Sequence, residues 1–434
     1  MKPASEQAIL VGLEWKTRGG PHRGSVLAAE ESLDELVELS ASAGARIVDR
    51  VLQSRAAPEA ATLIGQGKVD ELARAVQSLA ADVVIFDQDL SPTQQRNLEK
   101  ALDTKVIDRT QLILDIFASR ARTREGRLQV ELAQLNYLLP RLAGRGVEMS
   151  RLGGGIGTRG PGETQLETDR RRIAKRIKKL GDELEGVRAG RALHRRRRNA
   201  VPLATLALAG YTNAGKSTLF NRLTEAGVLA DAKMFATLDP TVRPLILPSR
   251  RRVLLSDTVG FIRNLPTTLV KAFRATLEEV NDAALVLHVV DISSPVAAEH
   301  TAHVFQVLAE IGAAGVPQIL VLNKLDRLDP ESRDPESQQR RLLGGIGANH
   351  AQVRAVAISA LTGAGIDRLL AIIDEVLPLD PIVRATVELD AGDGATLALL
   401  HQFGRVRATR YDGHRVVVEA EIPESLERRL AKRA

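Results

Sequence analysis

Residues Gly210–Ser217 read GYTNAGKS and directly follow the apolar run Leu203–Ala209. This order of a predicted strand, a glycine-rich turn and a helix start is what a phosphate-binding loop needs. The glycines let successive backbone N–H groups point at phosphate oxygens, and the helix N-terminus adds partial positive charge. Lys216 can reach the β- and γ-phosphates, and Ser217 can offer its hydroxyl to Mg²⁺. The stretch therefore predicts a nucleoside triphosphate site, although a plain surface turn would share its glycines.

A second segment, at the end of another predicted strand, supplies partners for the same phosphates. The strand Arg252–Ser256 ends in Asp257-Thr258-Val259-Gly260. Asp257 can hold a Mg²⁺-bound water. Gly260 can donate its N–H to a γ-phosphate because no side chain stands in the way.

The sequence FATLDPT, residues 235–241, lies between these two segments, where a first switch loop belongs. We expect Thr237 to bind Mg²⁺ through its hydroxyl. Thr241 is a competing candidate that the sequence alone hardly separates from it. The alternative is an ordinary turn around Asp239-Pro240.

A further predicted strand leads into Asn323-Lys324-Leu325-Asp326, whose chemistry selects the base. Guanine presents N1–H and N2–H₂ as neighbouring donors, and the Asp326 carboxylate can accept both. Adenine lacks this pair and would leave the carboxylate unpaired. Asn323 can support the base and the loop, while the Lys324 stem can pack over the ring. The backbone N–H groups of Ser359-Ala360-Leu361, after the next predicted strand, can bond guanine O6.

Together these segments predict a site for GTP or GDP with Mg²⁺. We expect the catalytic contacts from Lys216, Thr237 and Gly260, and Mg²⁺ ligation from Ser217 and Thr237. The residues expected to bind the nucleotide are Gly210, Tyr211, Thr212, Asn213, Ala214, Gly215, Lys216, Ser217, Phe235, Ala236, Thr237, Leu238, Asp239, Asp257, Thr258, Val259, Gly260, Asn323, Lys324, Leu325, Asp326, Ser359, Ala360 and Leu361.

The composition indicates aliphatic cores and no thiol chemistry. The 434-residue chain is 44% hydrophobic but only 3% aromatic, and it contains no cysteine. Disulfides and thiolate metal sites are therefore excluded. Its first ten residues lack a signal-peptide core, and no apolar run approaches the ~20 residues of a membrane span. We expect a monomeric, cytoplasmic protein with no membrane span.

Positive charge is concentrated in one segment. Residues Asp169–Arg198 contain 13 Lys and Arg against four Asp and Glu, a local charge of +9 in a chain that carries +6, so the remainder carries −3. A basic element joined to mildly acidic parts suggests a polyanionic partner. A solvated helical face or a disordered linker are the alternatives.

The alternation of strand and helix patterns predicts a multidomain α/β chain in four parts. Residues 1–111 predict a small α/β domain with a parallel sheet. Residues 112–200 predict a helical hairpin. Residues 201–378 predict a P-loop domain, a mostly parallel sheet with helices on both faces. Residues 379–434 predict a small α/β domain that contains a β-hairpin.

The helical hairpin is expected to combine one long helix over Leu112–Leu142 with a second over Glu163–Arg198. Between them, Gly144–Gly162 is too rich in glycine for a regular element, and we expect a mobile loop. The helices should pack antiparallel, so that this loop forms the tip. Heptad spacing defines the expected seam of the second helix, at Leu166, Ile173, Ile177, Leu180, Leu184 and Val187.

These residues resemble the HflX family of ribosome-associated GTPases over nearly the whole chain. The nucleotide-binding motifs alone would also suit neighbouring GTPase families, and the domain order and the string GPGETQLE make the match specific. The matching strings are GYTNAGKS (210–217), FATLDPT (235–241), DTVGFI (257–262), GPGETQLE (160–167), LIGQGK (63–68) and QLNYLLPR (134–141).

The resemblance implies a GTPase that binds the large ribosomal subunit and its rRNA and, in the GTP state, splits or rescues stalled or idle ribosomes. It also implies that the loop Gly144–Gly162 reaches ribosomal RNA, which suits an Arg- and Gly-rich loop at the tip of a basic hairpin. Two other functions stay open. One is a GTPase assembly factor for the large ribosomal subunit, and the other is a switch that binds a protein effector through the hairpin.

Many Ras-type GTPases place a Gln directly after the DxxG motif to orient the attacking water. Here that position is Phe261, followed by Ile262, and neither side chain can hydrogen-bond a water. We therefore expect slow intrinsic hydrolysis that the ribosome accelerates, on the scale of the roughly 10⁵-fold gain of activated Ras. The alternative is that Phe261 simply packs and another side chain places the water.

Overall fold

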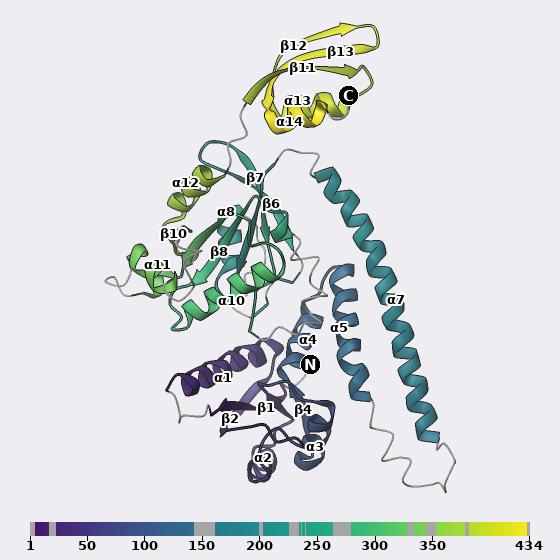
Figure 1. The fold of residues 1–434 in the computed structure, drawn as a ribbon, viewed down its shortest axis with the longest axis vertical. Helices are drawn as coiled ribbons and strands as arrows, with labels where there is room; N and C mark the ends of the chain where they lie inside the picture. Colours follow the sequence, from purple (N-terminus) through teal and green to yellow (C-terminus); the bar gives the residue numbers. More distant parts are fainter. Residues whose placement is uncertain are drawn as a thin grey trace.

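The computed structural model describes residues 5–16, 23–142, 161–198, 203–224, 234–235, 237–238, 240–263, 279–328, 334–343, 353–377 and 382–431. Within these residues, three β-sheets follow one another along the chain, each covered by helices, and two long helices lie beside them (Figure 1). The predicted multidomain α/β class is confirmed. None of the described helices has the length and apolarity of a membrane span.

The N-terminal unit is a four-stranded parallel sheet with helices on both faces. Its strand order is β2-β1-β3-β4. Helices α1 and α4 cover one face and α2 and α3 the other, which explains why all four residues of β3 are buried. The elements are β1 (Gln7–Trp15), α1 (Arg23–Ala43), β2 (Arg46–Arg55), α2 (Gln66–Leu79), β3 (Val83–Phe86), α3 (Pro92–Leu102), β4 (Lys105–Asp108) and α4 (Arg109–Arg120).

The prediction of one long helix over Leu112–Leu142 is wrong. The structure has two helices, α4 and α5 (Arg124–Leu142), because Ala121 adopts an extended conformation with φ −63° and ψ 112°. Thr123 then starts α5, since its hydroxyl accepts a hydrogen bond from the N–H of Gly126 at 2.9 Å. The break lets α4 pack on the N-terminal sheet while α5 turns back alongside it, where the Tyr137 hydroxyl donates to Asp108 at 2.8 Å.

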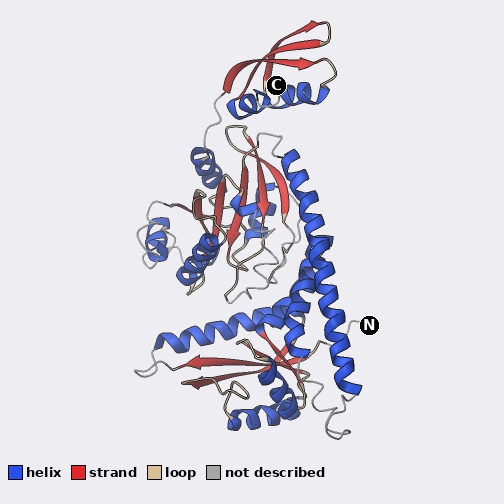
Figure 2. Ribbon diagram, turned by 45° about the vertical axis from the view of Figure 1, so that its right-hand side comes forward, coloured by secondary structure: helices blue, strands red, loops and turns tan. Residues whose placement is uncertain are grey.

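Helices α5 and α7 (Pro161–Arg198) form the predicted antiparallel hairpin, and Figures 1 and 2 both show them side by side. Leu180 and Leu184 of the predicted seam are buried against Leu128. Arg176 forms a two-pronged ion pair with Glu131, at 2.7 and 2.8 Å. Residues 143–160, which hold most of the predicted glycine-rich loop, lie outside the described residues.

The nucleotide unit is a six-stranded sheet in the order β10-β9-β8-β5-β7-β6, parallel except for β6. Helices α8 and α12 cover one face, and α10 and α11 cover the other. The carboxyl ends of the parallel strands meet at one edge, where α/β sheets bind ligands. The elements are β5 (Thr205–Gly210), α8 (Lys216–Thr224), β6 (Thr241–Ile246), β7 (Arg252–Asp257), β8 (Leu285–Asp291), α10 (Ala297–Glu310), β9 (Gln318–Asn323), η1 (Leu325–Arg327), α11 (Pro335–Leu343), β10 (Arg354–Ala357) and α12 (Ile366–Val376).

The C-terminal unit is a three-stranded antiparallel sheet in the order β11-β13-β12, with α13 and α14 packed on one face. The predicted β-hairpin is present, and Gly413 at its turn has a φ of +59°. The elements are β11 (Ile382–Asp390), α13 (Gly394–Phe403), β12 (Arg405–Asp412), β13 (Arg415–Pro423) and α14 (Glu424–Ala431).

The N-terminal and nucleotide units share one apolar cluster. Phe117 of α4 meets Phe235 edge to face, with ring centroids 4.6 Å apart. Helix α1 lies along the lower side of the nucleotide unit (Figures 1 and 2), and the Ser42 hydroxyl accepts a hydrogen bond from the N–H of Met234 at 2.9 Å. The phosphate-binding edge of the nucleotide sheet therefore faces the N-terminal unit.

Candidate nucleotide site

The turn after β5 has the backbone that a phosphate cradle requires. Gly210, Asn213 and Gly215 have φ values of +150°, +59° and +96°. A Cβ on Gly215 would lie 2.2 Å from Nδ2 of Asn323, and one on Gly210 would lie 2.3 Å from the carbonyl oxygen of Val289. Only glycine fits at these two places. Helix α8 then begins at Lys216, so its N-terminus adjoins the turn.

Lys216 is buried at the base of this turn. Its Nζ donates hydrogen bonds to the carbonyls of Gly210 at 3.0 Å and Tyr211 at 2.7 Å. Burial lowers the pKa of Lys216 to about 8, with Asp257 opposing this shift and Lys324 adding to it. Phosphate oxygens would replace the two carbonyls as acceptors and would favour the charged form.

Three oxygen-bearing side chains meet where Mg²⁺ is expected. The Asp257 Oδ2 accepts hydrogen bonds from Ser217 at 2.8 Å and Thr237 at 2.7 Å, and the two hydroxyls lie 2.8 Å apart. Asp257 is fully buried. Its Oδ1 has no hydrogen-bond partner among the described residues. Thr241 instead begins β6, in register with Asp257.

This cluster fits a divalent cation. Burial raises the pKa of Asp257, and the hydrogen bonds from Thr237 and Ser217 and the charge of Lys216 oppose the shift. A hard cation with oxygen ligands would satisfy the orphaned carboxylate oxygen. When bound, Mg²⁺ offsets phosphate charge, and Ser217 and Thr237 are the hydroxyls placed to hold it.

The base-recognition segments are tied to each other and to the cradle. Asn323 donates from Nδ2 to the carbonyl of Ala214 at 2.8 Å and accepts at Oδ1 from the N–H of Ala360 at 2.9 Å. Ser359 donates to Oδ1 of Asp326 at 2.5 Å. Side-chain hydrogen bonds, and not the backbone alone, therefore hold the two base-recognition segments in place.

A cavity of about 290 Å³ joins the phosphate and base ends. Leu238 and Val259 do not line it and are buried. Ala236 and Asp239 lie outside the described residues. The predicted residues that line the cavity are Thr212, Asn213, Gly215, Lys216, Ser217, Phe235, Thr237, Thr258, Gly260, Asn323, Lys324, Asp326, Ala360 and Leu361.

Phe261 is buried, which is compatible with both sequence interpretations of this position. Its side chain is 2% exposed. Its backbone bridges to the cradle, where its carbonyl accepts from the N–H of Thr212 at 2.7 Å and its N–H donates to Gly210 at 3.1 Å. The chain after Asp257 is therefore tied directly to the phosphate loop.

Tyr211 turns away from the cavity and toward the N-terminal unit. Its hydroxyl donates to Oε1 of Glu35 in α1 at 2.6 Å and accepts from the N–H of Arg263 at 2.9 Å. Glu35 also binds the buried Arg109, which pairs with Asp87 at 2.7 Å. The sequence gives no local signal for this contact, since Tyr211 and Glu35 are 176 residues apart.

The sequence motifs did not predict two other residues of the site, Asp291 and Arg222. Asp291 forms an ion pair with Lys324 at 2.6 Å, and its place at the end of β8 is a signal that could have revealed it. Arg222 in α8 donates to the carbonyls of Ala360, at 3.2 Å, and Leu361. It holds the loop expected at guanine O6, and no sequence motif marks it.

Four family models match the chain in the order of its units. The model described as "GTP-binding GTPase N-terminal" covers residues 30–118, and "GTP-binding GTPase Middle Region" covers residues 120–198. The model "50S ribosome-binding GTPase" covers residues 205–324, and "Elongation factor Tu GTP binding domain" covers residues 272–379.

Similar proteins match across these regions. A solved GTP-binding protein of Sulfolobus solfataricus in complex with GDP aligns at 24% identity and a TM-score of 0.45, over 85% of this chain and 98% of that one. GTPase HflX of Escherichia coli K12 is 46% identical over 88% of this chain and 84% of its own length. GTPase HflX of Lacrimispora saccharolytica is 44% identical over 100% of this chain and 97% of its own. The chain therefore belongs to the HflX family, and it is a GTPase that binds GTP and GDP with Mg²⁺.

Proposed function

We propose that this GTPase binds the large ribosomal subunit and, in its GTP-bound state, splits or rescues stalled or idle ribosomes. The observation that carries the proposal is a basic helical hairpin that connects through the N-terminal unit to the phosphate loop. Support for the ribosome as partner comes from the matching family description, "50S ribosome-binding GTPase". The same chemistry would serve an assembly factor, which the experiment below separates.

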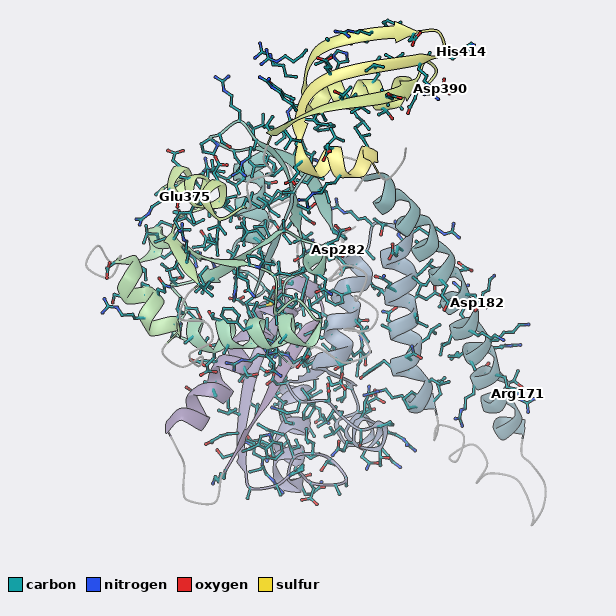
Figure 3. All side chains as sticks on the ribbon, turned by 45° about the horizontal axis from the view of Figure 1, so that its top comes forward. Arg171, Asp182, Asp282, Glu375, Asp390 and His414 are labelled. Carbon is teal, nitrogen blue, oxygen red and sulfur yellow. The ribbon has the colours of Figure 1, made fainter. Side chains whose placement is uncertain are left out.

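Helix α7 presents a basic surface to solvent. Arg171, labelled in Figure 3, lies on the side of α7 away from α5. The opposite side carries Leu180 and Leu184, which hold α7 against α5. A cationic surface on a fixed support suits the phosphate backbone of rRNA, whose neutralisation releases counterions. Among the described side chains of α7, the exposed cations are Arg170, Arg171, Arg172, Lys175, Arg176, Lys178 and Lys179, of which Arg176 is paired with Glu131 of α5.

The nucleotide chemistry in this proposal follows the geometry of the cavity. Lys216 and the N–H of Gly260 contact the γ-phosphate, Ser217 and Thr237 hold Mg²⁺, and Asp326 holds guanine. Hydrolysis is slow without the ribosome because the Phe261 side chain cannot hydrogen-bond the attacking water, and docking orders the segments around Thr237 and after Gly260. We also propose that the protein is monomeric and cytoplasmic, with unit borders near residues 111, 200 and 378.

Sedimentation of ribosomes separates the two ribosomal roles. Intact ribosomes are incubated with the protein and a non-hydrolysable GTP analogue, and subunits are resolved on a gradient. We expect dissociation into subunits with the analogue and none with GDP. Intact ribosomes in both samples would exclude splitting. Binding confined to precursor particles would point to assembly.

A charge variant tests the hairpin as the contact surface. Replacing Arg171, Arg172, Lys175 and Lys178 by Gln should weaken large-subunit binding and reduce its log–log salt slope by up to about 4, roughly one per lost phosphate contact. A matched variant changes four exposed arginines of the nucleotide unit, Arg243, Arg250, Arg252 and Arg368, to Gln. Equal losses in both variants, or an unchanged slope in the first, would contradict the assignment to α7.

A further inference from the structure

We propose that the Thr212 hydroxyl supplies the side-chain hydrogen bond to the γ-phosphoryl group and its attacking water that Phe261 cannot provide. The inference concerns GTP hydrolysis itself and does not depend on the ribosome as partner. It assigns a role to the Thr212 side chain in the reaction, whereas the P-loop motif requires only the backbone at this position.

The position of Thr212 places it at the phosphate end of the cavity. A Cβ built on Gly260 would lie 2.9 Å from Cα and 3.2 Å from Cβ of Thr212, and 3.0 Å from Nζ of Lys216. Thr212, Gly260 and Lys216 therefore converge on one point. Lys216 and the N–H of Gly260 are the groups expected to meet the γ-phosphate, so a third group at this point meets it too.

The hydroxyl of Thr212 is the unsatisfied group of the cradle. Its Oγ1 is buried without a hydrogen-bond partner among the described residues, and the residue is 6% exposed. The other polar side chains of the P-loop are engaged. Tyr211 bonds Glu35, Asn213 bonds Glu38 at 3.4 Å, Lys216 bonds two carbonyls, and Ser217 bonds Asp257.

An unpaired buried hydroxyl is unfavourable, because it has given up its hydrogen bonds to water without gaining a partner. In this conformation the DxxG segment lies directly on the cradle, with the Phe261 carbonyl bound to the N–H of Thr212. A γ-phosphate between Lys216 and Gly260 requires this segment to move. The movement exposes the hydroxyl to phosphate oxygens and water, so Thr212 gains a partner only in the triphosphate state.

The hydrogen bond acts without covalent chemistry at threonine. Water attacks the γ-phosphorus, the bond between that phosphorus and the β–γ bridging oxygen breaks, and GDP leaves with the bond's electron pair. The water proton passes to the phosphate product and then to solvent. The hydroxyl donates to a γ-oxygen or accepts from the water, and it ends in the protonation state in which it began.

Two variants of Thr212 separate this role from packing. Thr212→Val keeps the shape and the backbone N–H but removes the hydroxyl, and Thr212→Ser restores it. We measure single-turnover GTP hydrolysis, GDP affinity and thermal unfolding for the full chain. Thr205→Val, at the other end of β5, serves as the matched control.

We expect Thr212→Val to slow hydrolysis by about 10- to 10³-fold, the range for loss of one preorganised donor. GDP affinity should change by less than about threefold, because GDP lacks the γ-phosphate that would contact this hydroxyl, and Thr212→Ser should recover most of the rate. Hydrolysis by Thr212→Val at or above the wild-type rate would overturn the proposal. A Ser variant as slow as the Val variant would also overturn it.

Discussion

Replacing Asp326 by Asn tests guanine recognition at a single atom. The carboxylate already accepts from Ser359 through Oδ1 and is otherwise open to the cavity. An amide keeps one acceptor, but it turns the other into a donor that faces a guanine donor. Each hydrogen bond to a charged acceptor contributes about 1.5–3 kcal/mol. Losing one of the two bonds and opposing two donors should weaken GTP and GDP binding by about 1.5–3 kcal/mol or more, at least roughly 10- to 150-fold.

The assay is a competition titration with fluorescent GDP against GDP, XDP and ADP. Xanthine carries an acceptor where guanine carries its N2 amino group, so the amide of Asp326→Asn should favour XDP over GDP. Asp367→Asn, an exposed carboxylate on α12, serves as the control and should leave all three affinities unchanged. GDP binding by Asp326→Asn within threefold of the wild type, or no gain for XDP, would refute the assignment.

Three further outcomes follow from named contacts. Tyr211→Phe removes the hydrogen bond to Glu35, so hydrogen exchange should quicken in α1 while GDP affinity holds; unchanged exchange would show that the contact carries no stability. The pKa of buried Lys216 falls from 10.5 to about 8, so the unfolded chain binds more protons between these values. Without nucleotide, the thermal stability of the wild type relative to Lys216→Met should therefore rise from pH 8 to 10.5, and a flat difference would contradict the burial. Leu180→Ala, at a fully buried seam position, should destabilise the hairpin by about 2–5 kcal/mol, measured by circular dichroism against Leu138→Ala, whose side chain is exposed.

The nucleotide cavity was largely predictable because its information is local. The segments after β5, β7, β9 and β10 follow the carboxyl ends of parallel strands, which a parallel sheet brings to one edge. The segment 235–241 is the exception, since it precedes the antiparallel strand β6. The glycines at positions 210 and 215 indicate from the sequence that no side chain fits there. In the structure, a Cβ at these positions would collide with Val289 and Asn323, respectively. For Asp326 the sequence predicts which atoms would meet a base, because guanine alone presents two neighbouring donors to one carboxylate.

The connections between units were not predictable in the same way. The apolar spacing from Leu112 to Leu142 suits one helix, and only the packing of α4 on the sheet shows where it must end. Thr123 is a helix-capping residue type, but a threonine inside a helical pattern is too common to mark a break alone. The contact between Tyr211 and Glu35 depends on how two separately folded units meet, which no local pattern encodes.

Tyr211 links the nucleotide to the hairpin through one continuous set of contacts. Its hydroxyl joins the N–H of Arg263, just after the DxxG segment, to Glu35 of α1. Glu35 binds Arg109, the first residue of α4, which leads into α5 of the hairpin. A γ-phosphate that moves the DxxG segment therefore disturbs the hydrogen bond from the Arg263 N–H to the Tyr211 hydroxyl, a neutral bond worth about 0.5–1.5 kcal/mol. Because such coupling is reciprocal, a partner that pulls on the hairpin changes nucleotide affinity by the same factor. That contact limits the factor to about 2- to 13-fold, enough to favour one nucleotide state on a partner without locking the protein in it.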